Sequence, residues 1–487
     1  MQRFKTPPSD TVSPQAGLGA PVTAGPPDRR RLPDAASGRF RSRGILVATG
    51  GVLVANSWAF IAWMSRGTHL AIALGLTVSV FVVTLLVLRR SRVHVRSWFV
   101  LAVTLGVQLA GLTTPPLTSD DAFRYVWDGR VQTAGIDPYR YVPTDPSLRR
   151  LRDPLLFPDG GRPRINRPDV PTIYPPVAQA GFAVVSWVTP ARFGTLGVQV
   201  AALLAVVTTA WLLAGRNPGR PLVALVYGAC PAVMLEAANG AHLDAVSALL
   251  IVLAVDAGMR RRHWLAGVWL GLAAAVKLVP LLLVPVLLRR SWTTAIVAVS
   301  TVALVYLPHV AVVGGAVAGF LPGYAREEGY AGRSRFALLL FLPPEVRLVV
   351  AALLAVGLVA LAIHRSTRDP LPVTCCWLYG SAILLATPVY AWYGLPLAAL
   401  AILAGRWEWL SVWAASYVAF IGWAHIGVQA AGYGIALVVV VAALVVRRQR
   451  SLGPGRPARG LVGRPSPAGP STPARRGHLV PPAPHTR

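Results

Sequence analysis

The sequence predicts an all-α polytopic membrane protein, and three observations lead to this prediction. Of the 487 residues, 54% are hydrophobic and only 14% are charged. A soluble domain of this length needs considerably more charged surface. The apolar residues also form long blocks, such as residues 70–88, 201–215 and 431–446, instead of alternating with polar residues. Such blocks are typical of transmembrane helices.

The charge and the cysteine content exclude two other classes. The net charge of +28, from 47 Lys and Arg against 19 Asp and Glu, would indicate a nucleic-acid partner in a soluble protein. Here most arginines lie in the tails and in short connections between apolar blocks, as the positive-inside rule requires. We therefore expect no nucleic-acid partner. The three cysteines lie in apolar segments with neither disulfide nor zinc spacing.

Both ends of the chain are predicted to be disordered basic tails. Residues 1–43 and 447–487 are rich in Pro, Gly and Arg and cannot build a core, so the membrane domain is expected over residues 44–446. No short apolar segment with a cleavage site comes first, so we expect no removable signal peptide. The charge pattern places both tails in the cytoplasm and predicts a multi-pass protein of the plasma (inner) membrane.

Clusters of arginine define the predicted topology. If the connection at residues 89–96 is cytoplasmic, the third span ends outside and residues 116–172 form a long extracytoplasmic loop. This gives about 12–14 spans, near residues 44–64, 70–88, 97–115, 195–214, 221–236, 243–258, 264–276, 278–289, 293–313, 346–364, 371–388, 393–405, 409–425 and 430–446. A further span at residues 174–190 would move the later arginines outside, so an interfacial or re-entrant helix is expected there.

The long loop carries the richest group of polar residues. Asp120 and Asp121 follow the third span, and Arg124, Tyr125 and Asp128 lie three, four and seven residues after Asp121. On a helix, one face would then present two carboxylates and a guanidinium. Sugar transfer to a hydroxyl needs a carboxylate that accepts the proton, and a phosphate-linked donor needs cations. The spacing alone fits an ordinary solvated loop at least as well.

Other polar residues are expected on the same side of the membrane. Lys277 interrupts an apolar run, where an ionisable group is costly and usually functional, although a snorkelling lysine or a partner for a buried carboxylate is the alternative. His242 and Asp244 lie between two apolar blocks and fit a capped turn equally well. Trp392 and Tyr393 also fit an interfacial aromatic belt.

These residues together resemble a known family. Residues 120–130, with Gly135-Ile136-Asp137-Pro138-Tyr139 and Tyr174-Pro175-Pro176, resemble the first extracytoplasmic loop of GT-C glycosyltransferases. They are most similar to bacterial polyprenyl-phosphate-mannose-dependent α-mannosyltransferases, which build cell-envelope glycans. The resemblance covers roughly residues 97–400, including residues 239–244, Lys277-Leu278-Val279-Pro280 and Trp392-Tyr393.

The resemblance implies a GT-C-type bundle that transfers a hexose, most closely mannose, with inversion on the outer face of the membrane. The donor would be a polyprenyl-phosphate sugar, and the acceptor a glycolipid or a polysaccharide. The implied catalytic base is Asp121 or Asp120, and Asp121 is preferred because Arg124-Tyr125 follow it at the family's offset. The donor phosphate would be bound by Arg124, Arg130 and Lys277. The sugar or acceptor would be bound by Tyr125, Asp128, Tyr174, His242, Asp244, Trp392 and Tyr393.

The resemblance implies no cofactor. Some members of this fold use a divalent cation, but no full set of metal ligands stands out in the sequence. The chain departs from the family pattern at Arg167, Leu243 and Ala391, where His, Asn and Pro are more frequent. These departures leave the sugar and the acceptor open.

Three other classes are also compatible with parts of the sequence. A glycan polymerase or ligase with a lipid-diphosphate donor would need similar arginines outside. A transporter or flippase would show internal repeats or broken helices near the midplane, and only the short pair of segments around Lys277 favours it. A non-catalytic subunit of the same fold would not need the adjacent carboxylates Asp120 and Asp121.

Overall fold

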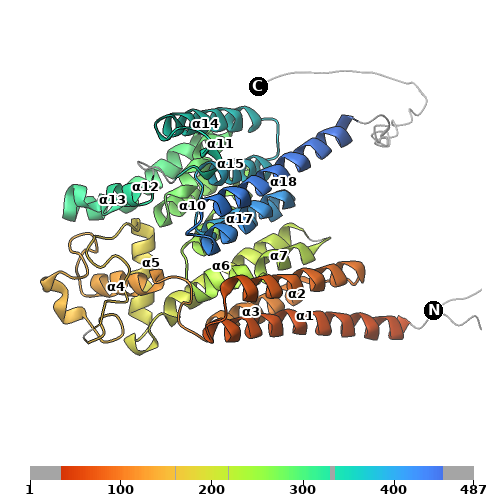
Figure 1. Cartoon of the computed structure of the whole chain (residues 1–487), viewed down its shortest axis with the longest axis horizontal. Coiled ribbons are helices and arrows are strands. Elements are labelled where there is room, and N and C mark those ends of the chain that lie inside the picture. Colours follow the sequence, from red (N-terminus) through yellow and green to blue (C-terminus); the bar gives the residue numbers. More distant parts are fainter. Residues whose placement is uncertain (1–34, 160, 218, 330–334, 453–487) are drawn as a thin grey trace, which may run out of the picture.

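A computed structural model of the chain describes residues 35–159, 161–217, 219–329 and 335–452. All regular elements within these ranges are helical (Figure 1), which confirms the predicted all-α class. The disorder predicted for the tails concerns mainly residues 1–34 and 453–487, which lie outside the described residues. Helix α1 (Ala35–Ser65) begins and α18 (Ile426–Leu452) ends beyond the predicted limits of the membrane domain, because arginine is a good helix former.

The long helices identify a polytopic membrane protein. Among the described residues, six helices are long and apolar enough to span a bilayer, and a pair bent by 49° between residues 221 and 239 would be a seventh span. The six are α1, α2 (Leu70–Arg90), α6 (Leu196–Arg216), α12 (Trp292–Val313), α14 (Pro344–Arg365) and α18. The bent pair contains α7 (Leu225–Gly228) and α8 (Pro231–Met234).

The other predicted spans are shorter helices, so helix length alone does not reach the expected 12–14. They are α3 (Ser97–Gly111), α9 (Asp244–Met259), α10 (His263–Val276), α15 (Leu371–Leu385), α16 (Gly394–Ala404) and α17 (Leu410–Ile421). Proline and polar turns end several of them early. After α10, for example, Lys277 is extended, and the chain continues through a short helical turn, Val279–Leu283, into α11 (Val284–Arg290).

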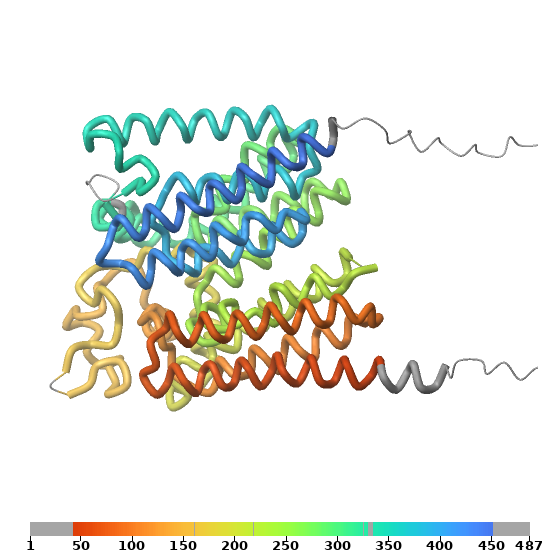
Figure 2. Tube along the Cα trace, turned by 45° about the vertical axis from the view of Figure 1, so that its right-hand side comes forward, coloured from red at the N-terminus to blue at the C-terminus, as the bar shows by residue number. Residues whose placement is uncertain are grey.

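The long helices form a bundle with two different ends (Figures 1 and 2). The start of α1 and the end of α18 lie at the same end of the bundle, on opposite sides of it. The loop 116–172, with its helix α4 (Asp121–Thr133), lies at the opposite end beside α5 (Pro176–Val188). The last turns of α2 and α6 contain Arg89, Arg90 and Arg216 and lie at the same end of the bundle as the start of α1. Basic residues therefore gather at the end opposite the loop.

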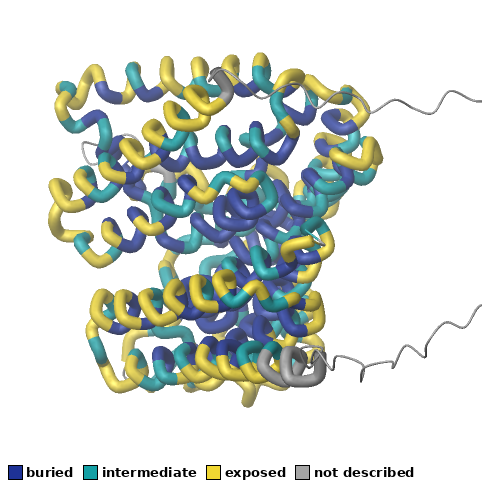
Figure 3. Tube along the Cα trace, turned by 90° about the vertical axis from the view of Figure 1, so that its right-hand side faces the viewer, coloured by how far each residue is buried: buried dark blue, intermediate teal, exposed yellow. Residues whose placement is uncertain are grey.

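The outer faces of the bundle are apolar, as lipid contact requires. Val83, Leu304, Leu353 and Val438 are more than half exposed although they lie on long helices. Figure 3 shows such exposed positions along the outside of the peripheral helices and buried positions between them. The buried apolar side chains form two large groups, and α9 and α16 contribute to both, so these two short helices join the halves of the bundle.

Helix α5 occupies the segment that was expected to be interfacial. Its 13 residues reach only about 20 Å, less than the ~30 Å hydrocarbon core. In Figure 1 it runs across the direction of the long helices and lies next to α4. Trp187 is 81% exposed at its end, a position where tryptophan often lies in the membrane interface. These features support the interfacial interpretation.

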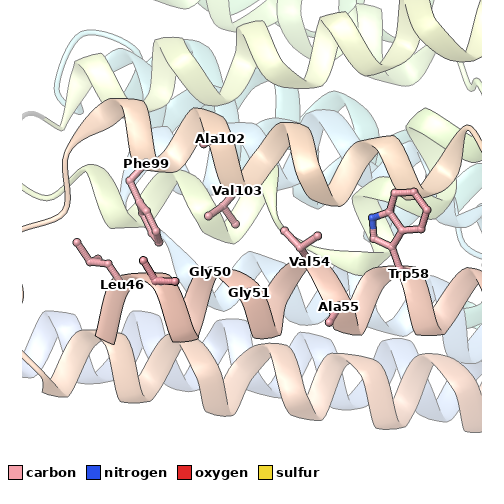
Figure 4. A pocket seen from close by; sticks show the side chains of 10 residues that line it. Leu46, Gly50, Gly51, Val54, Ala55, Trp58, Phe99, Ala102 and Val103 are labelled. Carbon is pink, nitrogen blue, oxygen red and sulfur yellow. The ribbon is translucent and has the colours of Figure 1, made fainter. Parts of the chain in front are cut away.

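An open groove of about 630 Å³ lies between α1 and α3 (Figure 4). Its lining has no ionisable side chain and consists of Leu46, Val47, Gly50, Gly51, Val54, Ala55, Trp58, Phe99, Ala102 and Val103. The indole N–H of Trp58 is used within the protein, because it donates a hydrogen bond to the carbonyl of Gly106 at 3.1 Å. This groove therefore offers no group for acid–base chemistry.

Candidate active site

The predicted helix after the third span exists and begins at Asp121. A carboxylate in the first turn is favourable because the N-terminus of a helix carries partial positive charge. The backbone N–H of Asp121 donates to Oγ of Ser119 at 3.1 Å. Asp120 is the residue before the helix, and its side chain caps no backbone N–H. The two adjacent carboxylates thus have different surroundings.

Asn166 distinguishes Asp121 from Asp120. The side-chain amide of Asn166 donates a short hydrogen bond to Oδ1 of Asp121. Partial burial and the neighbouring Asp121 carboxylate raise the pKa of Asp120, and Arg164 opposes this shift. Asn166 was not among the residues predicted for the site, because it lies 45 positions from Asp121 and no local spacing connects the two.

Arg124 and Asp128 form a buried brace inside the loop. Nε of Arg124 lies 2.9 Å from Oδ1 of Asp128, and both side chains are almost fully buried. Arg124 also donates to the carbonyl of Arg167 at 3.1 Å. The other oxygen of Asp128 accepts from Thr172 at 2.7 Å and from Gln179 at 3.0 Å. The pair therefore connects α4 to the end of the loop and to α5.

Arg130 lies away from Asp121. Nine residues of helix separate the two, which is about 13 Å. One end nitrogen of Arg130 lies 2.7 Å from Oδ2 of Asp153, and the other donates to the carbonyl of Leu151 at 3.0 Å. The structure does not bring this arginine together with the other predicted site residues.

Two tyrosines lie beside Asp121 at the contact between α4 and α5. The buried ring of Tyr125 stacks on Phe182 with 4.6 Å between ring centres, and it meets Tyr174 edge to face at 5.0 Å. The hydroxyl of Tyr139 donates to the carbonyl of Tyr174 at 2.6 Å. Both predicted tyrosines are therefore held in place by loop contacts.

Lys277 and Asp244 form an ion pair on the opposite wall. Nζ of Lys277 lies 2.6 Å from Oδ2 of Asp244, the first residue of α9. The same ammonium lies 3.9 Å from the ring centre of Tyr393, a cation–π distance. The sequence left open whether Lys277 snorkels or pairs with a buried carboxylate, and the structure shows the pair.

His242 lies in the turn before α9 and stacks on Trp392 with 4.0 Å between ring centres. Its Nδ1 lies 2.8 Å from the carbonyl oxygen of Glu236 and 3.3 Å from the Glu236 carboxylate. The hydroxyl of Tyr417 donates to the other carboxylate oxygen at 2.7 Å. Glu236 was not predicted as a site residue. It lies in a π-helical turn, a feature often found at functional sites.

The two walls belong to one site. The charge of Asp121 acts on His242, Asp244 and Tyr390, so the start of α4 lies within electrostatic range of the Lys277 and His242 groups. Asn239 connects them physically. Its amide donates to the carbonyl of Gly111 at 3.1 Å, and its side-chain oxygen accepts from the N–H of Leu117 at 3.0 Å, at the start of the loop.

Glu327 and Glu328, at the end of a helix far along the chain, contact residues near the same site. Nε of Arg167 lies 2.8 Å from Oε2 of Glu327 at the end of α13 (Leu321–Glu327). The neighbouring Glu328 accepts from the hydroxyl of Tyr390 at 3.3 Å and lies 3.4 Å from Arg335. Sequence spacing gives no indication of these contacts, because the partners lie far apart along the chain.

An apolar cleft of about 280 Å³ opens next to the ionisable groups. It lies between α4, α5, α6, α9 and α10, and its lining is apolar apart from the hydroxyl of Tyr125. Three of its lining residues, Ala241, Leu243 and Val276, directly precede His242, Asp244 and Lys277. These neighbours place the cleft next to the polar site. In the described part of the chain, no three His, Cys, Asp or Glu side chains are grouped to hold a metal ion.

A helical bundle with a buried cluster of ionisable side chains beside an apolar cleft defines a polytopic membrane protein with a candidate active site. Residues 42–294 match the family model of the alpha-(1->6)-mannopyranosyltransferase N-terminal domain, which is more than half of the chain. The protein belongs to this family of α-mannosyltransferases, as the sequence resemblance indicated. The matched region contains Asp121, Asn166, Glu236, His242 and Lys277 and ends before Trp392. No curated protein and no solved structure matches the chain.

Proposed function

We propose that this protein is a GT-C-type enzyme that transfers mannose from a polyprenyl-phosphate donor to a glycan or glycolipid acceptor. The proposed reaction takes place on the outer face of the plasma membrane and inverts the anomeric centre. The family description favours an α-(1→6) linkage. The observation that carries the proposal is that Tyr125, one helical turn after Asp121, and the sequence neighbours of His242, Asp244 and Lys277 line the apolar cleft.

In the proposed reaction, Asp121 is the base. Its carboxylate accepts the proton of the acceptor hydroxyl while the hydroxyl oxygen forms a bond to C1 of the sugar. The bond between C1 and the phosphate oxygen breaks, and the prenyl phosphate leaves with the electron pair. Lys277 would stabilise this developing charge, and electrostatic stabilisation of this kind is a large part of catalysis. Asn166 orients the Asp121 carboxylate.

The cleft supports a lipid-linked donor over a nucleotide sugar. A nucleotide would need polar partners for its base and diphosphate, whereas the cleft presents aliphatic side chains and the ring of Phe182. Burial of each methylene of a prenyl chain contributes about 0.8 kcal/mol. The position of the cleft between bundle helices would let such a chain enter from the bilayer.

The charge distribution supports an outward-facing site. Arg89, Arg90 and Arg216 lie at the end of the bundle opposite α4, and the positive-inside rule assigns such an end to the cytoplasm. A donor made in the cytoplasmic leaflet would then have to be translocated before use.

Gly181 offers a test of the cleft as the prenyl site. A Cβ at this position meets no atom within 4 Å, so Gly181→Leu would narrow the cleft without straining the fold. If the leucine side chain displaces about two methylenes of the prenyl chain from the cleft, the KM for a long-chain polyprenyl-phosphate mannose should rise roughly tenfold. The KM of a short-chain analogue should change much less. Equal effects on both donors, or no effect on either, would contradict the proposal.

Gly215→Leu is the matched control for this experiment. It adds the same side chain to α6, a Cβ there also meets no atom within 4 Å, and the residue does not line the cleft. Its KM values should equal those of the wild type. A GDP-mannose donor tested in parallel should give no transfer with any variant.

A further inference from the structure

Glu236 is a buried carboxylate that the proposed transfer does not use directly. Glu236 is only 2% exposed. One oxygen accepts the hydroxyl of Tyr417 at 2.7 Å, and the other lies 3.3 Å from Nδ1 of His242. A buried carboxylate is strongly unfavourable unless it is paired. The group that the structure places beside its second oxygen is the His242 imidazole, which is a cation when protonated.

The surroundings of His242 favour the charged ring. The groups that face it are Glu236 from the π-helical turn, Asp244 from α9 and Asp121 from α4, all of them carboxylates. Lys277 is paired with Asp244, and the aromatic ring of Trp392 covers one face of the imidazole. Burial alone would lower the pKa of His242, but the hydrogen bond and charge of Glu236, followed by the other two carboxylates, raise it.

The second ring nitrogen of His242 has no partner. Nε2 is buried and makes no hydrogen bond with any described residue. A buried N–H without an acceptor is energetically unfavourable. Because Nδ1 faces Glu236 and Trp392 fixes the ring plane, the orientation of Nε2 is determined by the fold. An acceptor atom of a ligand would remove this cost.

We propose that Glu236 is a positioning residue that holds His242 as an imidazolium, whose Nε2–H binds an oxygen of the donor phosphate. This inference rests on the proposed function and deepens it. When the C1–O bond breaks and the prenyl phosphate takes the electron pair, Nε2–H and the Lys277 ammonium bind its negative oxygens. The proton stays on His242, and the acceptor's proton goes to Asp121.

The proposal also assigns different tasks to the arginines and the histidine. Arg124 forms an ion pair with Asp128 and donates hydrogen bonds to backbone carbonyls, and Arg130 forms an ion pair with Asp153. His242 and Lys277 are the cationic groups that the structure places in the wall next to the cleft. Phosphate binding would then rely on the buried wall of the site rather than on the loop.

Glu236→Gln tests the proposal through the pH dependence of kcat/KM. The amide keeps the shape of the side chain and leaves the hydrogen bond between Nδ1 and the Glu236 backbone carbonyl in place, but it removes the negative charge. We expect roughly a tenfold loss at neutral pH, together with a shift of the alkaline limb of the profile to lower pH by about one unit. Activity should return as the pH is lowered. A uniform loss at every pH, or an unchanged profile, would overturn the proposal.

Two variants complete this experiment. Glu408→Gln is the matched control, because Glu408 is also a buried carboxylate but pairs with Arg447 at the other end of the bundle. Its pH profile should equal that of the wild type. Tyr417→Phe removes the hydrogen bond to the other oxygen of Glu236 and should shift the limb in the direction opposite to Glu236→Gln, because the carboxylate loses a partner that disperses its charge. This variant provides the test if Glu236→Gln does not insert.

A binding measurement separates this inference from the proposed function. The imidazole of His242 can be followed by NMR in protein labelled with ¹⁵N-histidine while polyprenyl phosphate is added. We expect a perturbed Nε2 signal in the wild type and a weaker one in Glu236→Gln. If this signal changes but no mannose is transferred, the dyad binds phosphate and the donor assignment fails. If mannose is transferred and the signal does not change, the role given to Glu236 and His242 is wrong.

Discussion

Nζ of Lys277 lies 2.6 Å from Oδ2 of Asp244, and this ion pair joins the break after α10 to the first turn of α9. The Asp244 side chain is 2% exposed and that of Lys277 is 22% exposed. The pair is therefore part of the fold as well as of the proposed phosphate site. Its two roles can be separated by mutation.

Lys277→Met should destabilise the protein and abolish transfer. Asp244 would remain as a buried charge without its cation, which typically costs about 3–5 kcal/mol. The double variant Lys277→Met/Asp244→Asn removes both charges and should regain most of the lost stability, but not the activity. Thermal unfolding in detergent and a transfer assay measure the two effects. A double variant no more stable than Lys277→Met would show that the ion pair is not the cause.

Asn166→Ala should lower kcat while KM changes little. The variant removes the hydrogen bond that orients the Asp121 carboxylate. A hydrogen bond to a charged group contributes about 1.5–3 kcal/mol, so we expect roughly a tenfold to hundredfold loss. Asn217→Ala, which removes an amide at the end of α6, is the control and should behave as the wild type. Steady-state kinetics measure kcat and KM of both variants. An unchanged kcat in Asn166→Ala would exclude the orienting role.

Arg124→Met should loosen the loop 116–172. Asp128 would keep only the neutral partners Thr172 and Gln179 in a buried position. We expect faster proteolysis of the loop and a lower melting temperature, with a smaller effect for Arg130→Met, whose ion pair with Asp153 is more exposed. If Arg124→Met instead leaves stability intact and raises the KM of the donor, Arg124 binds the phosphate directly.

Asp120 should make stability fall as the pH rises above 3.8, its usual pKa. Burial and the Asp121 charge raise its pKa in the folded protein, so the folded state holds the proton over a range in which the unfolded chain has lost it. Asp120→Asn removes this contribution and should become more stable than the wild type toward neutral pH. Melting temperatures across that range provide the measurement, and parallel curves for the two proteins would contradict it.

The parts of the fold that local patterns determine were predicted well. Helical spacing indicates the helix that begins at Asp121. Charge and length indicate that the helix within residues 174–190 does not span the membrane. The number of spans was less accessible, because Pro280 and Pro285 divide one apolar run into pieces too short to cross a bilayer. Hydropathy measures composition along the chain and not where the backbone bends.

The site was predictable only as far as sequence motifs reach. The fold brings Asp121, His242, Asp244 and Lys277 into one region, and the roles assigned to them stay predictions. Asn166 and Glu236 were missed as members of the site, because their roles depend on contacts that only tertiary structure creates. The assignment of Arg124 to the donor phosphate stays a prediction, since its buried pairing with Asp128 could not be read from an i, i+4 spacing alone.

Transfer of labelled mannose from polyprenyl-phosphate mannose in membranes tests the central claim most directly. The wild type, Asp121→Asn and Asp120→Asn are compared at equal levels of inserted protein. We predict that the wild type transfers, that Asp121→Asn loses roughly a hundredfold or more of the rate, and that Asp120→Asn keeps most of it. Transfer by Asp121→Asn at close to the wild-type rate would contradict the assignment of the base. A wild type without transfer from this donor would contradict the proposed function itself.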